Sequence, residues 1–171
     1  MTYSVGFPPA ATCDAKLLIL GSLPGQRSLE LRQYYAQPRN TFWTLMSSLF
    51  GFDADACYVD RLQSLNTRGV ALWDVCESAH RPGSLDQRIE RSTVRVNDFE
   101  RFFEMHPDIT LIGFNGATAA SLYQRLVLPR LSVRAAAIAS RRLPSTSPAH
   151  ATLTFAQKEE KWRSALAPFL D

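Results

Sequence analysis

Four short, almost continuous apolar runs are spaced widely along the chain. They span residues 16–22, 70–76, 109–115 and 135–139 and read KLLILGS, VALWDVC, ITLIGFN and AAAIA. A strand with one face in water alternates apolar and polar residues, whereas a strand in a parallel sheet is covered on both faces and is apolar throughout. The runs therefore predict a short, mainly parallel central sheet of about four strands.

Segments with a helical spacing of apolar residues lie between these runs and after the last one. They span residues 41–50, 58–65, 96–105, 118–127 and 155–169. Strands that alternate with helices indicate an α/β fold, and we expect a three-layer α/β/α sandwich. Ligands of such open sheets bind beyond the carboxyl ends of the strands. We therefore expect functional residues directly after Ser22, Cys76, Asn115 and Ala139.

The length and the N-terminal residues indicate how many domains to expect and in which compartment. A chain of 171 residues fits a single domain over 1–171, and we expect residues 1–11 to form a loose N-terminal segment. This segment has neither the basic flank nor the apolar stretch of a secretion signal. No apolar run approaches the roughly 20 residues that span a bilayer. We therefore expect a cytoplasmic, monomeric protein with no membrane contact.

The cysteines and basic residues indicate which cofactors and ligands to expect. Cys13, Cys57 and Cys76 are odd in number and far apart, without a CxxC pair, so we expect no disulfide, no metal site and no cofactor. The net charge is +3, and 3 of the 19 basic residues are lysines. The arginines suit phosphate contacts, although a GC-rich genome would give the same bias.

The segment 21–43, GSLPGQRSLELRQYYAQPRNTFW, carries the densest set of candidate site residues. Its glycines and Pro24 allow the backbone to approach a ligand closely with free N–H groups. It contains neither GxxxxGK[ST] nor GxGxxG, so it is not a nucleotide-phosphate loop. The aromatic face of Tyr35 can stack on a nucleobase, and Asn40 can hold a water molecule. Alternatively, Tyr34, Phe42 and Trp43 are core residues and Asn40 caps a helix.

Two further clusters follow later strands. The loop LPSTSPA at 143–149, preceded by Arg141 and Arg142, offers hydroxyl and N–H groups of the kind that bind phosphate. A surface turn of ordinary composition would look the same. Asn115, in GFNGA, can read the edge of a base with its amide, or it is a turn residue beside Gly116.

Taken together, the three clusters resemble the uracil-DNA glycosylase superfamily, and most closely its hypoxanthine-DNA glycosylase branch. GSLPG followed by QYYAQPRNTFW resembles the first motif region of that branch, and LPSTSPAHA is similar to its second motif. GVALWDVCESAHRPGSLDQRI resembles a segment shared with the mismatch-specific uracil/thymine glycosylases. The resemblance covers nearly the whole chain.

The resemblance implies roles for individual residues. Many members carry Asp or Asn in the first motif where this chain has Leu23, and no acid stands nearby in the sequence. The water-positioning role would therefore move to Asn40, with Tyr35 stacked on the base and Asn115 in contact with it. The loop before these residues would bind the base through Ser22, Leu23, Pro24 and Gly25. Phosphate contacts would come from Arg141, Arg142, Ser145, Thr146, Ser147 and Pro148, whereas His150 matches no catalytic histidine.

The implied function is that of a monofunctional DNA glycosylase in base-excision repair. It would act on damaged double-stranded DNA, flip out a deaminated base and hydrolyse its bond to deoxyribose, with hypoxanthine favoured over uracil or xanthine. None of the three lysines falls in a motif, so a Schiff-base nucleophile has no evident candidate. A nucleoside hydrolase acting on small molecules, or a non-catalytic DNA-binding member of the fold, is the alternative.

Overall fold

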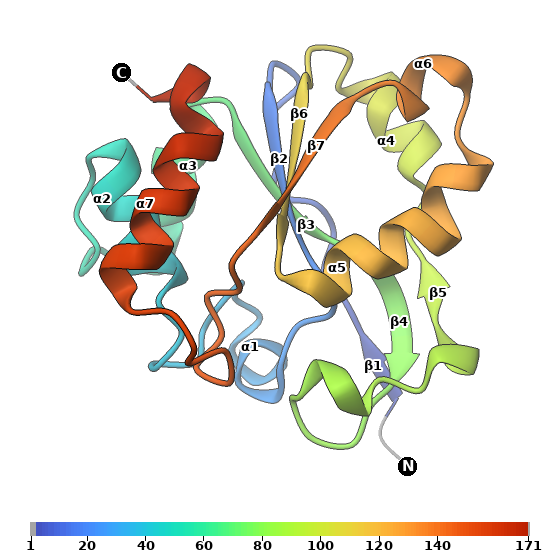
Figure 1. Cartoon of the computed structure of the whole chain (residues 1–171), viewed down its shortest axis with the longest axis horizontal. Coiled ribbons are helices and arrows are strands. Elements are labelled where there is room, and N and C mark those ends of the chain that lie inside the picture. Colours follow the sequence, from blue (N-terminus) through green and yellow to red (C-terminus); the bar gives the residue numbers. More distant parts are fainter. Residues whose placement is uncertain (1–2, 171) are drawn as a thin grey trace.

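The centre of the fold is a four-stranded parallel sheet, seen in a computed structural model that describes residues 3–170 (Figure 1). Its strands are β2 (Leu17–Gly21), β3 (Val70–Asp74), β6 (Leu111–Asn115) and β7 (Ala139–Leu143). They are hydrogen-bonded in the order β3-β2-β6-β7, and every neighbouring pair is parallel. The predicted α/β class and parallel sheet are confirmed.

Helices cover both faces of this sheet, which gives the expected three layers (Figure 1). One layer holds α2 (Phe42–Phe50), α3 (Tyr58–Thr67) and α7 (Phe155–Leu166). The other holds α4 (Phe99–Met105), α5 (Ala117–Leu122) and α6 (Val133–Ala136). The short α1 (Gln26–Leu31), which the sequence did not indicate, lies in the loop after β2.

Neighbouring residues of β2 belong to two different cores. Leu17 and Ile19 pack with the α2, α3 and α7 side chains, whereas Leu18 and Leu20 pack with the α4 and α5 side chains. All four are fully buried. Burial of each such side chain contributes roughly 1.5–3 kcal/mol, so a continuous apolar run is what this position requires.

The position of the fourth strand was predicted wrongly. We expected it at 135–139, but Val133–Ala136 forms α6 and the strand runs from Ala139 to Leu143. The Ser132 hydroxyl accepts a hydrogen bond from the Ala135 N–H at 3.3 Å and caps the helix, and alanine is the strongest helix former. The strand that follows lies at the sheet edge and is largely exposed, so it lacks the apolar pattern of a buried strand.

The run 70–76 also divides in two. β3 ends at Asp74, and β4 (Cys76–His80) begins a second, antiparallel sheet with the order β1-β4-β5. β5 (Arg95–Val96) occupies the start of the segment expected to be helical from 96, so α4 begins later, at Phe99. The strand of this second run therefore ends at Asp74 and not at Cys76.

The expected loose segment at 1–11 is ordered where the structure describes it. β1 (Tyr3–Val5) pairs with β4, and the Gly6 N–H donates to the Glu77 carbonyl oxygen at 2.8 Å. Ala10 forms a bridge with Leu72 at the outer edge of the central sheet. These backbone pairings correct the prediction over residues 3–10.

None of the helices within residues 3–170 has the length and apolar character needed to cross a membrane.

Trp162 links α7 to the loop after β7 and provides a test of the packing. Its side chain is fully buried, and its indole N–H donates to the Pro144 carbonyl oxygen at 2.8 Å. Trp162→Phe leaves that carbonyl without a donor, so we expect the free energy of unfolding in urea to fall by about 1–3 kcal/mol. The exposed Lys161→Ala in the same helix should change it by less than about 0.5 kcal/mol. Equal stability of the two variants would contradict this role of the indole.

Candidate functional site

A cavity of about 530 Å³ opens at the carboxyl edge of the central sheet. Its walls come from the chain segments that follow β2, β4, β6 and β7, together with Asp74 at the end of β3. Eleven of the predicted site residues line it: Ser22, Leu23, Pro24, Gly25, Tyr35, Asn40, Asn115, Ser145, Thr146, Ser147 and Pro148. The structure thus brings together residues more than 100 positions apart, as the strand-end argument requires.

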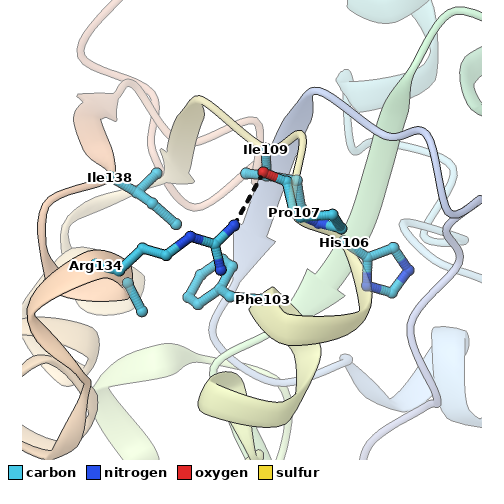
Figure 2. A pocket seen from close by; sticks show the side chains of 7 residues that line it. Phe103, His106, Pro107, Ile109, Arg134 and Ile138 are labelled. Carbon is cyan, nitrogen blue, oxygen red and sulfur yellow. Dashed lines mark hydrogen bonds between the residues drawn. The ribbon is translucent and has the colours of Figure 1, made fainter.

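A second cavity, of about 80 Å³, lies between the end of α4 and α6 and has a different character (Figure 2). Phe103, Ile109 and Ile138 line it, and Arg134 Nη2 donates to the Pro107 carbonyl oxygen at 3.4 Å across it. Its volume is that of a few water molecules. The larger cavity is therefore the candidate site.

Arg81 holds the loop that follows β2. It is 1% exposed, and its guanidinium donates to the carbonyl oxygens of Leu23 and Pro24. It also lies 3.6 Å from Asp86, which in turn accepts a 2.6 Å hydrogen bond from the Ser22 hydroxyl. In a trans peptide the N–H points opposite to the carbonyl, so the Gly25 N–H points away from Arg81. Within the described chain this N–H has no hydrogen-bond acceptor, which leaves it free for a ligand.

Tyr35 is held in an unusual backbone conformation beside the cavity. Its φ is 55°, in the left-handed region that residues other than glycine rarely adopt and that often marks a functional site. One face of its ring stacks on Phe42, with the ring centroids 3.9 Å apart. Phe42 and Trp43 are buried and, with Tyr34, belong to the core, as the alternative interpretation of these residues expected.

Asn40 lies just before α2 and lines the cavity. Its Oδ1 accepts a hydrogen bond at 2.9 Å from the N–H of Phe42, the first residue of the helix. The N-cap is Thr41, so the alternative that Asn40 caps the helix is corrected by one position. An amide oxygen has two lone pairs and the amide nitrogen two hydrogens, so the bond to Phe42 leaves the Asn40 side chain able to bind a water molecule.

Asn115 is engaged with the loop after β7. Its Nδ2 donates to the Thr146 hydroxyl at 2.9 Å, and its Oδ1 accepts from the Thr146 N–H at 3.0 Å. Thr146 is 1% exposed, and its carbonyl oxygen accepts from the Thr41 N–H. The pair ties the end of β6 and the start of α2 to one loop, and Thr146 therefore lies beneath the surface that phosphate would contact.

The other predicted phosphate contacts are more open. The Ser145 and Ser147 hydroxyl oxygens accept hydrogen bonds from the N–H groups of Ser147 and Ala149, which leaves both hydroxyl hydrogens free to donate. Arg141 and Arg142 lie on the exposed edge strand β7 and do not line the cavity. They are thus placed beside the site and outside it.

Sequence reasoning missed Asp74. It ends β3 and lines the cavity, although it is only 4% exposed. Burial, and secondly the charge of Asp86, raise the pKa of this carboxyl from its ordinary 3.8 to about 7, while Arg81 lowers it. The sequence signal for Asp74 is an acid at the end of an apolar run, and a strand expected to continue to Cys76 conceals it. The expectation of no acid near the first motif is therefore corrected, since Asp74 and Asp86 reach it from elsewhere in the chain.

The described residues contain no group of three or more His, Cys, Asp or Glu side chains arranged to hold a metal ion. The three cysteines are unpaired, and Cys76 alone is buried. The side chains that line the cavity carry amide, hydroxyl, phenol, carboxyl, guanidinium and imidazole groups.

Comparison with known proteins gives consistent matches. The family model of the uracil DNA glycosylase superfamily matches residues 8–170. A protein of Methanosarcina acetivorans named hypoxanthine DNA glycosylase is 34% identical over 160 residues, which cover 93% of this chain and 95% of the relative. One of the same name from Methanosarcina barkeri is 39% identical over 112 residues, 65% of this chain and 70% of the relative. A solution NMR structure of a candidate uracil DNA glycosylase from Methanosarcina acetivorans superposes with a TM-score of 0.82 at 32% identity, covering 98% of this chain and 99% of that one.

The raised pKa of Asp74 predicts a pH dependence of stability. Between its unfolded pKa near 3.8 and its folded pKa of about 7, the folded state holds a proton that the unfolded state has lost. Stability from this group is thus present at low pH and decreases as the pH rises through that window, by up to about 1.4 kcal/mol per pH unit. Asp74→Asn should remove this component in urea unfolding from about pH 4 to about pH 7. Parallel stability curves for wild type and variant would show that Asp74 ionises normally.

Proposed function

Because the chain belongs to the uracil DNA glycosylase superfamily, we propose that it is a monofunctional DNA glycosylase that removes a deaminated base. The proposal rests on one observation above all: Tyr35, Asn40 and the loop Ser22–Gly25 line a single cavity at the carboxyl edge of the sheet. Such a cavity can receive one base that has been rotated out of the duplex. Hydrolysis of its bond to deoxyribose would leave an abasic site.

The geometry suits the chemistry of the N-glycosidic bond. The sugar gains oxocarbenium character while the departing base gains negative charge, so the site needs hydrogen-bond donors for the base and a held water molecule. The Gly25 N–H, turned away from Arg81, is such a donor. Asn40, which has spare hydrogen-bonding capacity, would orient the water toward C1′. Tyr35 would stack on the base with the ring face that Phe42 leaves free.

Hypoxanthine is the favoured base. The two relatives named hypoxanthine DNA glycosylase support this choice, whereas uracil and xanthine share the same pairing groups and are the alternatives. Deaminated bases are mispaired, so their extrusion costs less than that of an intact pair. Damaged double-stranded DNA is thus the expected substrate.

No lysine lines the cavity in the part of the chain that the structure describes. Lys158 is 6% exposed, and its ammonium donates to the His150 carbonyl oxygen. A lyase reaction needs a lysine or other amine that attacks C1′, so the proposed enzyme leaves the DNA strand intact. We propose that the enzyme acts as a monomer and in the cytoplasm.

A gel assay tests this function. Duplexes that carry one deoxyinosine, deoxyuridine or deoxyxanthosine are incubated with the enzyme, with free deoxyinosine as a separate substrate. We expect strand breaks at deoxyinosine only after alkali treatment, and no cleavage of the free nucleoside. Breaks without alkali would reveal a lyase, and cleavage of the nucleoside would indicate a nucleoside hydrolase. Binding of abasic DNA without any turnover would indicate a non-catalytic member of the fold.

Asn40→Ala tests the water-positioning role in the same assay. Loss of a group that acts on the transition state should lower the single-turnover rate constant about 100- to 1,000-fold. The variant also loses the hydrogen bond from the Phe42 N–H, which should cost about 1 kcal/mol of stability. Asn40→Ser can still accept that hydrogen bond but lacks the amide, so it should be as slow as Asn40→Ala while remaining more stable. A variant without the amide that kept full activity would exclude Asn40 from catalysis.

Arg141 and Arg142, with Ser145 and Ser147, would contact the phosphates that flank the extruded nucleotide. Replacement of Arg141 by Ala should weaken binding to all duplexes and reduce the slope of log K against log salt by about 1. Arg68 is also exposed but precedes β3, at the opposite edge of the sheet, so Arg68→Ala serves as the control. Identical slopes for the two variants and the wild type would place the DNA elsewhere.

A further inference from the structure

Asp74 is the buried polar group in the cavity that the proposed chemistry has not used. Its Oδ2 is enclosed and has no hydrogen-bond partner among residues 3–170. The Tyr35 hydroxyl is buried in the same wall, where the Asn115 side chain is a hydrogen-bonding neighbour. Buried polar groups are normally satisfied by hydrogen bonds. The unpaired carboxyl of Asp74, in the wall of the cavity, therefore indicates that a ligand completes it.

Gly21 makes room for this pair. β2 and β3 are in parallel register with Gly21 opposite Asp74. A Cβ on Gly21 would lie 2.5 Å from Asp74 Oδ1 and 3.1 Å from the Tyr35 hydroxyl. Because Gly21 has no side chain, the Asp74 carboxyl and the Tyr35 hydroxyl can both lie next to it at the end of the sheet. Any larger residue at position 21 would displace one of them.

The amide expected to read the base is partly occupied. Both polar atoms of the Asn115 side chain are bonded to Thr146, which leaves one Nδ2 hydrogen and one Oδ1 lone pair. Asp74 ends β3, on the opposite side of β2 from β6, and its side chain makes no hydrogen bond with the described residues. Of these two cavity residues, Asp74 therefore has the greater free hydrogen-bonding capacity.

On the basis of the glycosylase function proposed above, we propose that Asp74 acts as a neutral carboxylic acid that reads the lactam edge of the extruded base. A neutral carboxyl presents one donor, its O–H, beside one acceptor, its C=O. Deamination creates the complementary pair on the base, a ring N–H next to a carbonyl oxygen. The substrate class is thus the bases with a lactam edge, namely hypoxanthine, xanthine and uracil.

The surroundings favour the neutral form. The titratable or charged groups that face this carboxyl from the packed elements are Tyr34, Tyr35, Cys76, Arg81 and Asp86. Arg81 is the only cation among them, and it is shared with Asp86 and with two carbonyl oxygens of the loop. An ionised carboxylate cannot donate to a base carbonyl, so ionisation would remove half of the match.

A neutral carboxyl that rotates its O–H could also pair with adenine. Discrimination against intact DNA therefore comes from the extrusion step, which costs more for a base in a Watson–Crick pair. Asp74 would orient a lactam base that has entered the cavity and would increase the affinity of the cavity for it.

Three variants test this assignment through the pH dependence of single-turnover rate constants on a deoxyinosine duplex. The wild-type rate constant at about pH 8 should be about tenfold below that at about pH 6, because the carboxyl ionises near neutrality. Asp74→Ala should be at least about 100-fold slower throughout. Asp74→Asn keeps a donor and an acceptor, so it should recover most of that loss and no longer slow as the pH rises. Asp108→Asn, an exposed control, should follow the wild type.

A decline with pH that persists in Asp74→Asn, or near wild-type rates in Asp74→Ala, would overturn the assignment. Urea unfolding of each variant shows whether it folds. If Asp74→Ala does not fold, the comparison of wild type with Asp74→Asn still tests the assignment.

A binding measurement separates this inference from the function on which it rests. Free hypoxanthine and 1-methylhypoxanthine, which lacks the N1–H, are titrated into the protein and followed by NMR. We expect the wild type to prefer hypoxanthine by about tenfold, the value of one good hydrogen bond, and Asp74→Ala to lose that preference. No activity on any duplex would refute the glycosylase function, whereas an unchanged preference in Asp74→Ala, or none in the wild type, would refute the role of Asp74.

Discussion

The parallel pairing of β2 with β3 on one side and β6 on the other is the constraint on which the site depends. Parallel strands end at the same edge, so the segments that follow them must meet there whatever their separation in sequence. The two apolar cores fix the sheet from both faces. The cavity is therefore a product of topology, and local residues decide only what it can bind.

Two clamps convert this meeting of loops into a defined cavity. Arg81 holds the backbone after β2 through hydrogen bonds to its carbonyl oxygens. Asn115 holds the loop after β7 through two hydrogen bonds with Thr146. Both use buried groups whose hydrogen bonds are shielded from water, where loss of one partner leaves the other unsatisfied. The loops are thereby held in place before a ligand arrives, which lowers the entropy lost on binding.

The sequence predicted those features that depend on local pattern. Continuous apolar runs predicted the three buried strands, and the motifs in segments 21–43 and 143–149 predicted most of the cavity wall. The edge strand β7 was misplaced because an exposed strand carries no such pattern. Asp74 and Arg81 were missed because their roles arise from burial and from partners distant in the chain. The roles assigned to Asn40, Tyr35 and the phosphate contacts remain predictions.

Arg81 follows β4 directly and therefore connects the small antiparallel sheet with the large one. The small sheet, whose β4 residues Cys76 and Ala79 pack in one of the two cores, is in this way also bonded to the loop that lines the cavity. A displacement of β1 or β4 would therefore move the Arg81 guanidinium and, with it, the peptide groups of Leu23 and Pro24. A substitution in the small sheet, far from the cavity, would in this way change the position of the cavity loop.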